Sequence, residues 1–134
     1  MSAVPAAVYV DSSALVKLVI PEPESGPLRA ELGRWERHVS SAVARVEVVR
    51  ACGRVDSAAR EVAEQVVRAL DLISVDDDLL DEAARLEPVE LRSLDAIHVA
   101  SALLLGDALG VAITYDERMR QAMIAAGLPA ANPQ

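Results

Sequence analysis

Aromatic residues, cysteine, histidine and lysine are all scarce in this sequence of 134 residues. Only three aromatic side chains occur, Tyr9, Trp35 and Tyr115, so binding of nucleic acid by stacking bases on aromatic platforms is not expected. The single cysteine, Cys52, excludes an internal disulfide and favours a reducing compartment, and burial is the ordinary role of such a thiol. One cysteine and two histidines provide no ligand spacing typical of zinc.

Basic residues are outnumbered, since 21 acids against 13 bases give a formal charge of -8. This is the wrong sign for a protein that holds nucleic acid with a broad basic surface, so a phosphate substrate would need a metal ion or local arginines. The longest apolar run, Val99 to Leu105, is interrupted by Ser101 and is too short to span a bilayer, and the N-terminus lacks the pattern of a signal peptide. We therefore expect a soluble, cytoplasmic protein with no membrane partner.

Hydrophobic residues make up 52% of the chain, enough for the core of one domain over residues 1–134. Short apolar runs alternate with segments of helical periodicity. Strands are predicted near 8–10, 38–40, 72–75 and 111–114, and helices near 12–20, 27–35, 42–55, 58–70, 79–86, 94–105 and 116–126. Ser57, Ser93 and the acidic triplet 76–78 are predicted to cap helices. This alternation predicts an α/β fold with a parallel sheet covered by helices on both faces.

Three aspartates lie at or beside the ends of apolar runs: Asp11, Asp95 and Asp116. Ligands of open parallel sheets bind outside the carboxyl ends of the strands, so acids that are distant in sequence can converge there. Carboxylates gathered in this way repel one another unless a cation neutralises them. The sequence therefore predicts a divalent-metal site.

A fourth acid, Glu47, lies in an otherwise nearly apolar helical segment. Glu47, Arg50 and Arg54 fall within an arc of roughly 60°, shared only with Val43. An ordinary i,i+3 ion pair between Glu47 and Arg50 at the solvent edge would explain the same spacing.

Asp95 also allows two interpretations, because a carboxylate is stabilised at a helix N-terminus even without a function. His98 lies one turn after Asp95 and could orient it, although a lone histidine on an apolar helix is also compatible with a purely structural role in the core.

Four carboxylates on separate elements suit Mg²⁺, with Mn²⁺ as a substitute, because these ions prefer oxygen ligands and are held by few protein carboxylates plus substrate phosphate. Such an ion can lower the pKa of bound water, align the water for attack on phosphorus and stabilise the leaving oxygen. Phosphodiester hydrolysis is therefore the expected reaction class.

Four segments resemble the PIN-domain family, and more narrowly the VapC-type ribonuclease toxins of type II toxin-antitoxin (VapBC) systems. They are Val10–Leu18 (VDSSALVKL), Ser40–Glu47 (SSAVARVE), Arg92–Ala100 (RSLDAIHVA) and Thr114–Met119 (TYDERM). The resemblance covers nearly the whole chain, and four ordered motifs are more specific than any single acid. It implies a single PIN-like domain with a doubly wound, mainly parallel sheet flanked by helices.

The resemblance also implies a Mg²⁺-dependent endoribonuclease whose catalytic acids are Asp11, Glu47, Asp95 and Asp116. By this analogy Asp11 and Asp95 are the principal metal ligands, and Asp116 binds or completes a second metal position. Glu47 positions the attacking water or assists proton transfer. Ser13 and Thr114 resemble the hydroxyl residues that support such a pocket, although each could equally serve as a local cap.

The same resemblance implies a homodimer and a cognate VapB-type antitoxin whose C-terminal segment occupies the active-site groove. An antitoxin arginine would be suited to the acidic pocket, since it replaces the metal charge and forms bidentate bonds to carboxylates. Candidate contacts to RNA phosphates are Arg50, Arg54, Arg92, Arg118 and Arg120, for each of which an ordinary solvated surface role is the alternative.

Three rival classes make different demands on the sequence. A response-regulator receiver domain needs a lysine near the end of a late strand, but the only lysine is Lys17, in the first helix. A haloacid-dehalogenase-type phosphatase needs a second aspartate two residues after the first, where Ser13 stands. A PIN-like domain that only binds RNA or protein remains the serious alternative, and it predicts no metal-dependent turnover.

Overall fold

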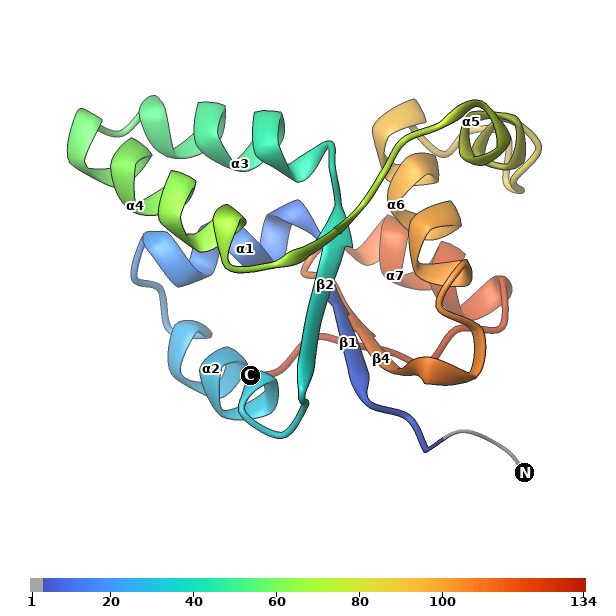
Figure 1. Cartoon of the computed structure of the whole chain (residues 1–134), viewed down its shortest axis with the longest axis horizontal. Coiled ribbons are helices and arrows are strands. Elements are labelled where there is room, and N and C mark those ends of the chain that lie inside the picture. The colour runs from blue at the N-terminus through green and yellow to red at the C-terminus, as the bar shows by residue number, and fades with distance from the viewer. Residues whose placement is uncertain (1–3) are drawn as a thin grey trace.

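The computed structural model describes residues 4–134 and places a five-stranded sheet between two groups of helices (Figure 1). The strands are β1 (Ala7–Val10), β2 (Arg37–Ser41), β3 (Asp71–Ile73), β4 (Leu109–Ile113) and β5 (Ala130–Ala131). The helices are α1 (Ser12–Val19), α2 (Ser25–Leu32), α3 (Ala44–Gly53), α4 (Ser57–Arg68), α5 (Asp77–Ala84), α6 (Ser93–Leu103) and α7 (Glu117–Ala125), with a short 3₁₀ turn η1 (Gly106–Ala108).

The sheet order is β3-β2-β1-β4-β5, and all pairings are parallel. The chain first builds outward from β1 to β2 and β3, and then returns to add β4 on the other side of β1. This reversal creates a topological switch point between β1 and β4, where open α/β sheets bind ligands. The predicted α/β fold with a doubly wound parallel sheet is confirmed.

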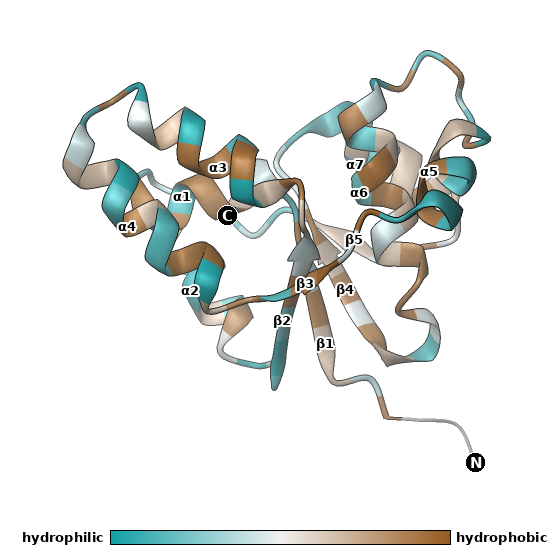
Figure 2. Ribbon diagram, turned by 45° about the horizontal axis from the view of Figure 1, so that its top comes forward, coloured by the Kyte–Doolittle hydropathy of each residue, from teal (hydrophilic) through white to brown (hydrophobic). Residues whose placement is uncertain are grey.

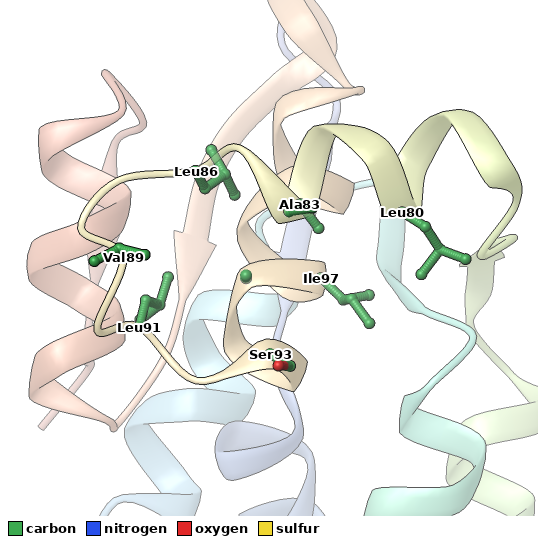
Figure 3. A pocket seen from close by; sticks show the side chains of 9 residues that line it. Leu80, Ala83, Leu86, Val89, Leu91, Ser93 and Ile97 are labelled. Carbon is green, nitrogen blue, oxygen red and sulfur yellow. The ribbon is translucent and has the colours of Figure 1, made fainter.

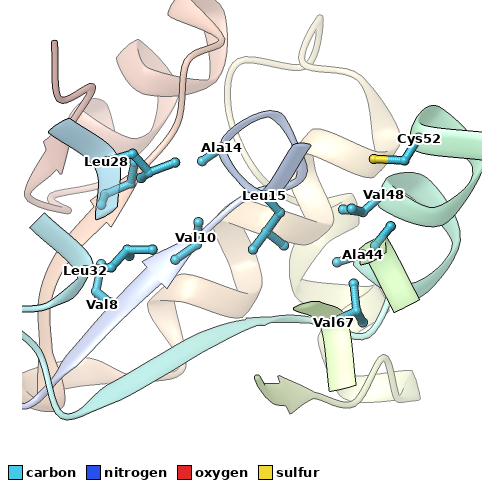
Figure 4. Close-up of a cluster of buried hydrophobic side chains, with 12 residues drawn as sticks. Val8, Val10, Ala14, Leu15, Leu28, Leu32, Ala44, Val48, Cys52 and Val67 are labelled. Atoms are coloured by element: carbon cyan, nitrogen blue, oxygen red, sulfur yellow. The ribbon is translucent and has the colours of Figure 1, made fainter. Parts of the chain in front are cut away.

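Strand β1 is buried along its whole length, as a central parallel strand must be. Its side chains alternate between the two faces of the sheet: Val8 and Val10 join the core under α1 to α4 (Figure 4), whereas Tyr9 joins the core under α6 and α7. Cys52 is fully buried in the first core, as expected. Figure 2 shows apolar colour along β1 and β4, while α4 carries both apolar and polar turns.

The segment after α2 packs closely against β4 through Trp35. A Cβ atom on Gly110 would lie 2.0 Å from the Trp35 ring, so only glycine fits at this position of β4.

Among the helices of residues 4–134, none is long and apolar enough to cross a membrane.

Four helices are preceded by an N-cap aspartate whose side chain accepts a hydrogen bond from the amide three residues later. These aspartates are Asp11, Asp56, Asp76 and Asp116. The prediction that the triplet 76–78 caps a helix is confirmed. The predictions for Ser57 and Ser93 are wrong, because each is the first residue of its helix. Asp56 takes the capping position before α4, and Arg92 precedes α6 without a side-chain cap bond.

Candidate active site

Asp11 is buried at the carboxyl end of β1, with only 1% of its surface exposed. One carboxylate oxygen accepts hydrogen bonds from Ser13 Oγ at 2.7 Å and from the Ala14 amide at 3.0 Å, and the other accepts from Thr114 Oγ1 at 2.6 Å. Burial raises the pKa of Asp11, and the bonds from Thr114, Ser13 and Ala14 only partly oppose this. The ionised carboxylate is therefore under electrostatic cost, which a nearby cation would relieve.

Thr114 and Ser13 connect Asp11 to the turn that follows β4, the neighbouring strand in the sheet. Thr114 Oγ1 accepts from the Asp116 amide at 3.0 Å, and Ser13 Oγ accepts from the Tyr115 amide at 3.0 Å. These bonds fix the turn after β4 against the turn after β1. Both hydroxyl residues therefore donate hydrogen bonds to Asp11.

Asp95 and Asp116 are joined by the Arg92 guanidinium. Arg92 Nε donates to Asp95 Oδ2 and Arg92 Nη2 donates to Asp116 Oδ2, each at 3.0 Å. The other Asp116 oxygen caps α7 through the Met119 amide. Asp95 is buried in the first turn of α6, whereas the Arg92 side chain is 72% exposed and approaches from solvent.

Glu47 reaches the site from α3. Its Oε1 accepts from Ser12 Oγ at 2.7 Å and lies 2.8 Å from His98 Nε2. Burial disfavours ionised Glu47, but the hydrogen bonds from His98 and Ser12 outweigh this effect and hold the pKa of Glu47 below its ordinary value. Glu47 therefore pairs across the site with α6 rather than with Arg50 on its own helix.

The donor chemistry suits a hard divalent cation, because all four acids offer oxygen and the most buried one carries an unfavourable charge. Within residues 4–134, however, no three His, Cys, Asp or Glu side chains are arranged to hold a metal ion directly. Arg92 draws the outer oxygens of Asp95 and Asp116 toward itself. The site therefore has the oxygen donors that a divalent cation prefers, and in this structure one oxygen of Asp95 and one of Asp116 are bound to the guanidinium.

Two shallow grooves carry the arginines predicted to face RNA. Arg50 and Arg54 line one groove together with Ser12, Ser13 and Glu47. Arg92 and Arg118 line another that includes Asp95. Arg120 instead forms two hydrogen bonds to Glu117 on its own helix.

A further pocket lies between α5, the loop after it and α6, and its lining is almost entirely apolar (Figure 3). Leu80, Leu86, Val89 and Ile97 contribute to it, and Ser93 is its one polar side chain. The residues that line this pocket include no carboxylate.

The structure brings all four predicted acids together at one end of the sheet. It also corrects one interpretation: His98 contacts Glu47, Ser12 and Tyr9, whereas Asp95 is held by Arg92. Sequence reasoning missed Ser12 and Tyr9 as parts of the site. The i,i+3 spacing of Arg92 and Asp95 was a usable signal for their ion pair.

Comparison with known proteins gives consistent results along the whole chain. The family model described as PIN domain matches residues 8–124. Ribonuclease VapC46 of Mycobacterium tuberculosis is 48% identical over 128 residues, covering 96% of this chain and 98% of that protein. Ribonuclease VapC47 of the same species is 35% identical over 131 residues, covering 94% and 96%.

Solved structures support the same fold. The M. tuberculosis toxin VapC20, described as cleaving the sarcin-ricin loop, superposes with a TM-score of 0.71 at 19% identity, over 94% of this chain and 99% of that chain. The FitAcB structure from Neisseria gonorrhoeae gives a TM-score of 0.72 at 16% identity, over 94% and 97%. From the family match and the close relatives, this chain belongs to the PIN-domain family and, within it, to the VapC-type toxins.

Proposed function

We propose that this protein is the toxin of a type II toxin-antitoxin pair and cleaves RNA as a Mg²⁺-dependent endoribonuclease in the cytoplasm. The observation that carries the proposal is the convergence of four carboxylates around the switch point of the sheet, with buried Asp11 at its centre. The ribonuclease names of the relatives support RNA as the substrate class.

Asp11, Asp95 and Asp116 would hold the metal ion, which supplies Lewis-acid activation and charge neutralisation during phosphodiester hydrolysis. Mn²⁺ is the expected substitute. Ser13 and Thr114 keep Asp11 in place, as their hydrogen bonds indicate. Glu47 is not among the proposed metal ligands. Its ionised carboxylate is suited to orient the attacking water or to accept its proton.

RNA would approach over the two grooves beside the acids. Arg50 and Arg54 line the side toward Glu47, and Arg92 and Arg118 line the side toward Asp95. Their guanidinium groups are suited to phosphate oxygens and would offset the overall negative charge near the scissile bond.

A VapB-type antitoxin is the proposed protein partner, and a homodimer the proposed assembly. The bridge from Arg92 to Asp95 and Asp116 supports an arginine-based inhibition, because it demonstrates that the acidic pocket accepts a guanidinium. The FitAcB neighbour and the VapC names of the relatives are consistent with a toxin-antitoxin partnership.

The test is cleavage of a panel of end-labelled RNA hairpins by purified, antitoxin-free protein with Mg²⁺ or Mn²⁺. EDTA and Asp95→Asn serve as negative controls, and Asp78→Asn, an exposed acid on α5, is the matched variant. Discrete cuts that persist in Asp78→Asn and vanish with EDTA and in Asp95→Asn are expected. Cleavage that survives in Asp95→Asn would contradict the assigned site.

A PIN-like domain that only binds RNA or protein is the second candidate. The observation in its favour is that Arg92 already neutralises two of the acids in this structure. This function predicts RNA retention in a binding assay with no product under any metal condition.

A further inference from the structure

His98 occupies the middle of a buried chain of hydrogen bonds that the proposed metal ligands do not use. Its Nδ1 lies 2.7 Å from the Tyr9 hydroxyl, and its Nε2 lies 2.8 Å from Glu47 Oε1 and 3.2 Å from Ser12 Oγ. Tyr9 and His98 are 0% and 1% exposed. Four elements, β1, α1, α3 and α6, therefore meet through one imidazole.

The partners of the ring define its protonation. An ionised Glu47 carboxylate can only accept, so Nε2 must carry the proton that lies between them. Burial raises the pKa of Tyr9, so its hydroxyl stays protonated at neutral pH, and it shares a hydrogen bond with Nδ1. The Ser12 hydroxyl donates to the same Glu47 oxygen. Both ring nitrogens are therefore paired, and Nε2–H donates to Glu47.

We propose that His98, oriented by Tyr9, is a positioning residue that holds Glu47 for its work on the attacking water. Glu47 lies on α3 and lines an open groove. Its side chain has three rotatable bonds, so its carboxylate needs hydrogen bonds to keep one orientation. Both hydrogen bonds converge on Oε1, so neither of them occupies Oε2, the oxygen available to the attacking water. The inference rests on the proposed function, because Glu47 acts only if the protein hydrolyses RNA.

Removing His98 alone would leave the Tyr9 hydroxyl buried without its partner and would destabilise the fold. The informative variant is therefore Tyr9→Phe/His98→Leu, which replaces both polar partners by apolar groups of similar size. His98→Gln retains an amide donor and tests rescue. His38→Gln is the matched control, since His38 lies at the amino end of β2, where its Nε2 contacts the Leu32 and Trp35 carbonyls.

The kinetic readout is kcat and KM for the hairpin RNA that the wild type cleaves, alongside the melting temperature. In Tyr9→Phe/His98→Leu we expect kcat to fall about 10–100-fold, the range for groups that orient a functional side chain, with KM and melting temperature close to wild type. His98→Gln should recover part of the loss, and His38→Gln should cleave normally. In a Glu47→Gln background the double change should have little further effect. A wild-type kcat in the double variant, or an undiminished loss in the Glu47→Gln background, would overturn the proposal.

A second readout needs no activity. The ¹⁵N chemical shifts of the His98 ring in the metal-free protein report whether Nε2 is protonated. A protonated Nε2, with a proton resonance that shifts in Glu47→Gln, supports the proposal, and an unprotonated Nε2 overturns it. If the wild type cleaves no RNA, the proposed function fails, while this spectrum still decides whether His98 holds Glu47.

Discussion

The Arg92 guanidinium neutralises two carboxylates of the site and thereby resembles an internal substitute for a cation. It donates to Asp95 and Asp116 at 3.0 Å each. These carboxylates raise the pKa of Arg92, and the hydrogen bond to Asp95 contributes most to this rise. A metal ion bound to these carboxylates would be repelled by the guanidinium charge, so Arg92 opposes metal binding while it stays beside them.

Replacing Arg92 by glutamine should strengthen metal binding. The Kd of the folded protein for Mn²⁺, measured by isothermal titration calorimetry, is expected to fall roughly two- to fivefold, a modest change because the arginine side chain is mostly exposed. Arg118→Gln is the control, since it removes the same charge from the same groove without losing a bond to either acid. An equal change in both variants would mean that only overall charge matters.

Glu47 should contribute to stability in a pH-dependent way. Its pKa is lower in the folded protein than the ordinary value of 4.5, so the ionised form favours folding. The contribution is fully present above pH 4.5 and is lost as the pH falls through the lower folded pKa. Urea denaturation of wild type and Glu47→Gln between pH 3.5 and 7 should therefore give a difference that is constant near neutrality and shrinks below about pH 4.5. A difference that grows on acidification would contradict this sign.

At the scale of elements, helix capping is shared by aspartates of the proposed site and by aspartates outside it. Asp11, Asp56, Asp76 and Asp116 all cap helices, so capping alone does not identify the site. Asp11 differs by its burial and by its bonds to a second strand turn through Thr114. Asp11 is therefore distinguished from Asp56 and Asp76 by its position at the end of a central strand and not by its local capping geometry.

Asp76→Ala should separate capping from function. Loss of the bond to the Leu79 amide is expected to cost about 1 kcal/mol of unfolding free energy, while RNA cleavage is unchanged because α5 contributes no acid to the site. Asp78→Ala, in the first turn of the same helix, should cost only a few tenths of that value through the helix dipole. Chemical denaturation and the cleavage assay check both; equal losses in the two variants would remove the special role of the cap.

Sequence periodicity predicted four of the five strands and all seven α-helices, with boundaries displaced by one to three residues at several ends. Strand β5 was missed because two alanines carry no strand signal and pair only by virtue of β4 beside them. The caps at Ser57 and Ser93 were misplaced by one residue, since Asp56 caps α4 and Ser93 is already helical. Local preference cannot decide between neighbouring capping residues when both are compatible with the helix.

At the scale of the whole molecule, the order β3-β2-β1-β4-β5 determines where chemistry is placed. Asp11 and Asp116 follow the two strands that flank the switch point, while Glu47 and Asp95 reach them from helices on opposite faces of the sheet. The site is thus assembled from four elements by the fold, and metal binding should be linked to the stability of the entire domain.

Mg²⁺ or Mn²⁺ should stabilise the folded protein, because an ion that binds only the native state adds RT ln(1 + [L]/Kd), about 2.7 kcal/mol at 100 times Kd. Asp95→Asn should reduce this gain, whereas Asp78→Asn should leave it unchanged. Melting curves across a metal titration measure the effect. Equal metal-induced shifts in wild type and Asp95→Asn would remove Asp95 from the metal site.

The sequence by itself determined the α/β class and the aliphatic core, and it supplied four candidate acids, because hydrophobic periodicity and local motifs do not depend on the tertiary structure. The family resemblance rested on four local motifs and agrees with the family match. Only the tertiary structure decided the partners of those acids. Glu47 pairs with His98 rather than Arg50, and Arg92 joins Asp95 to Asp116, because side chains more than a few residues apart meet only after the sheet has set their positions.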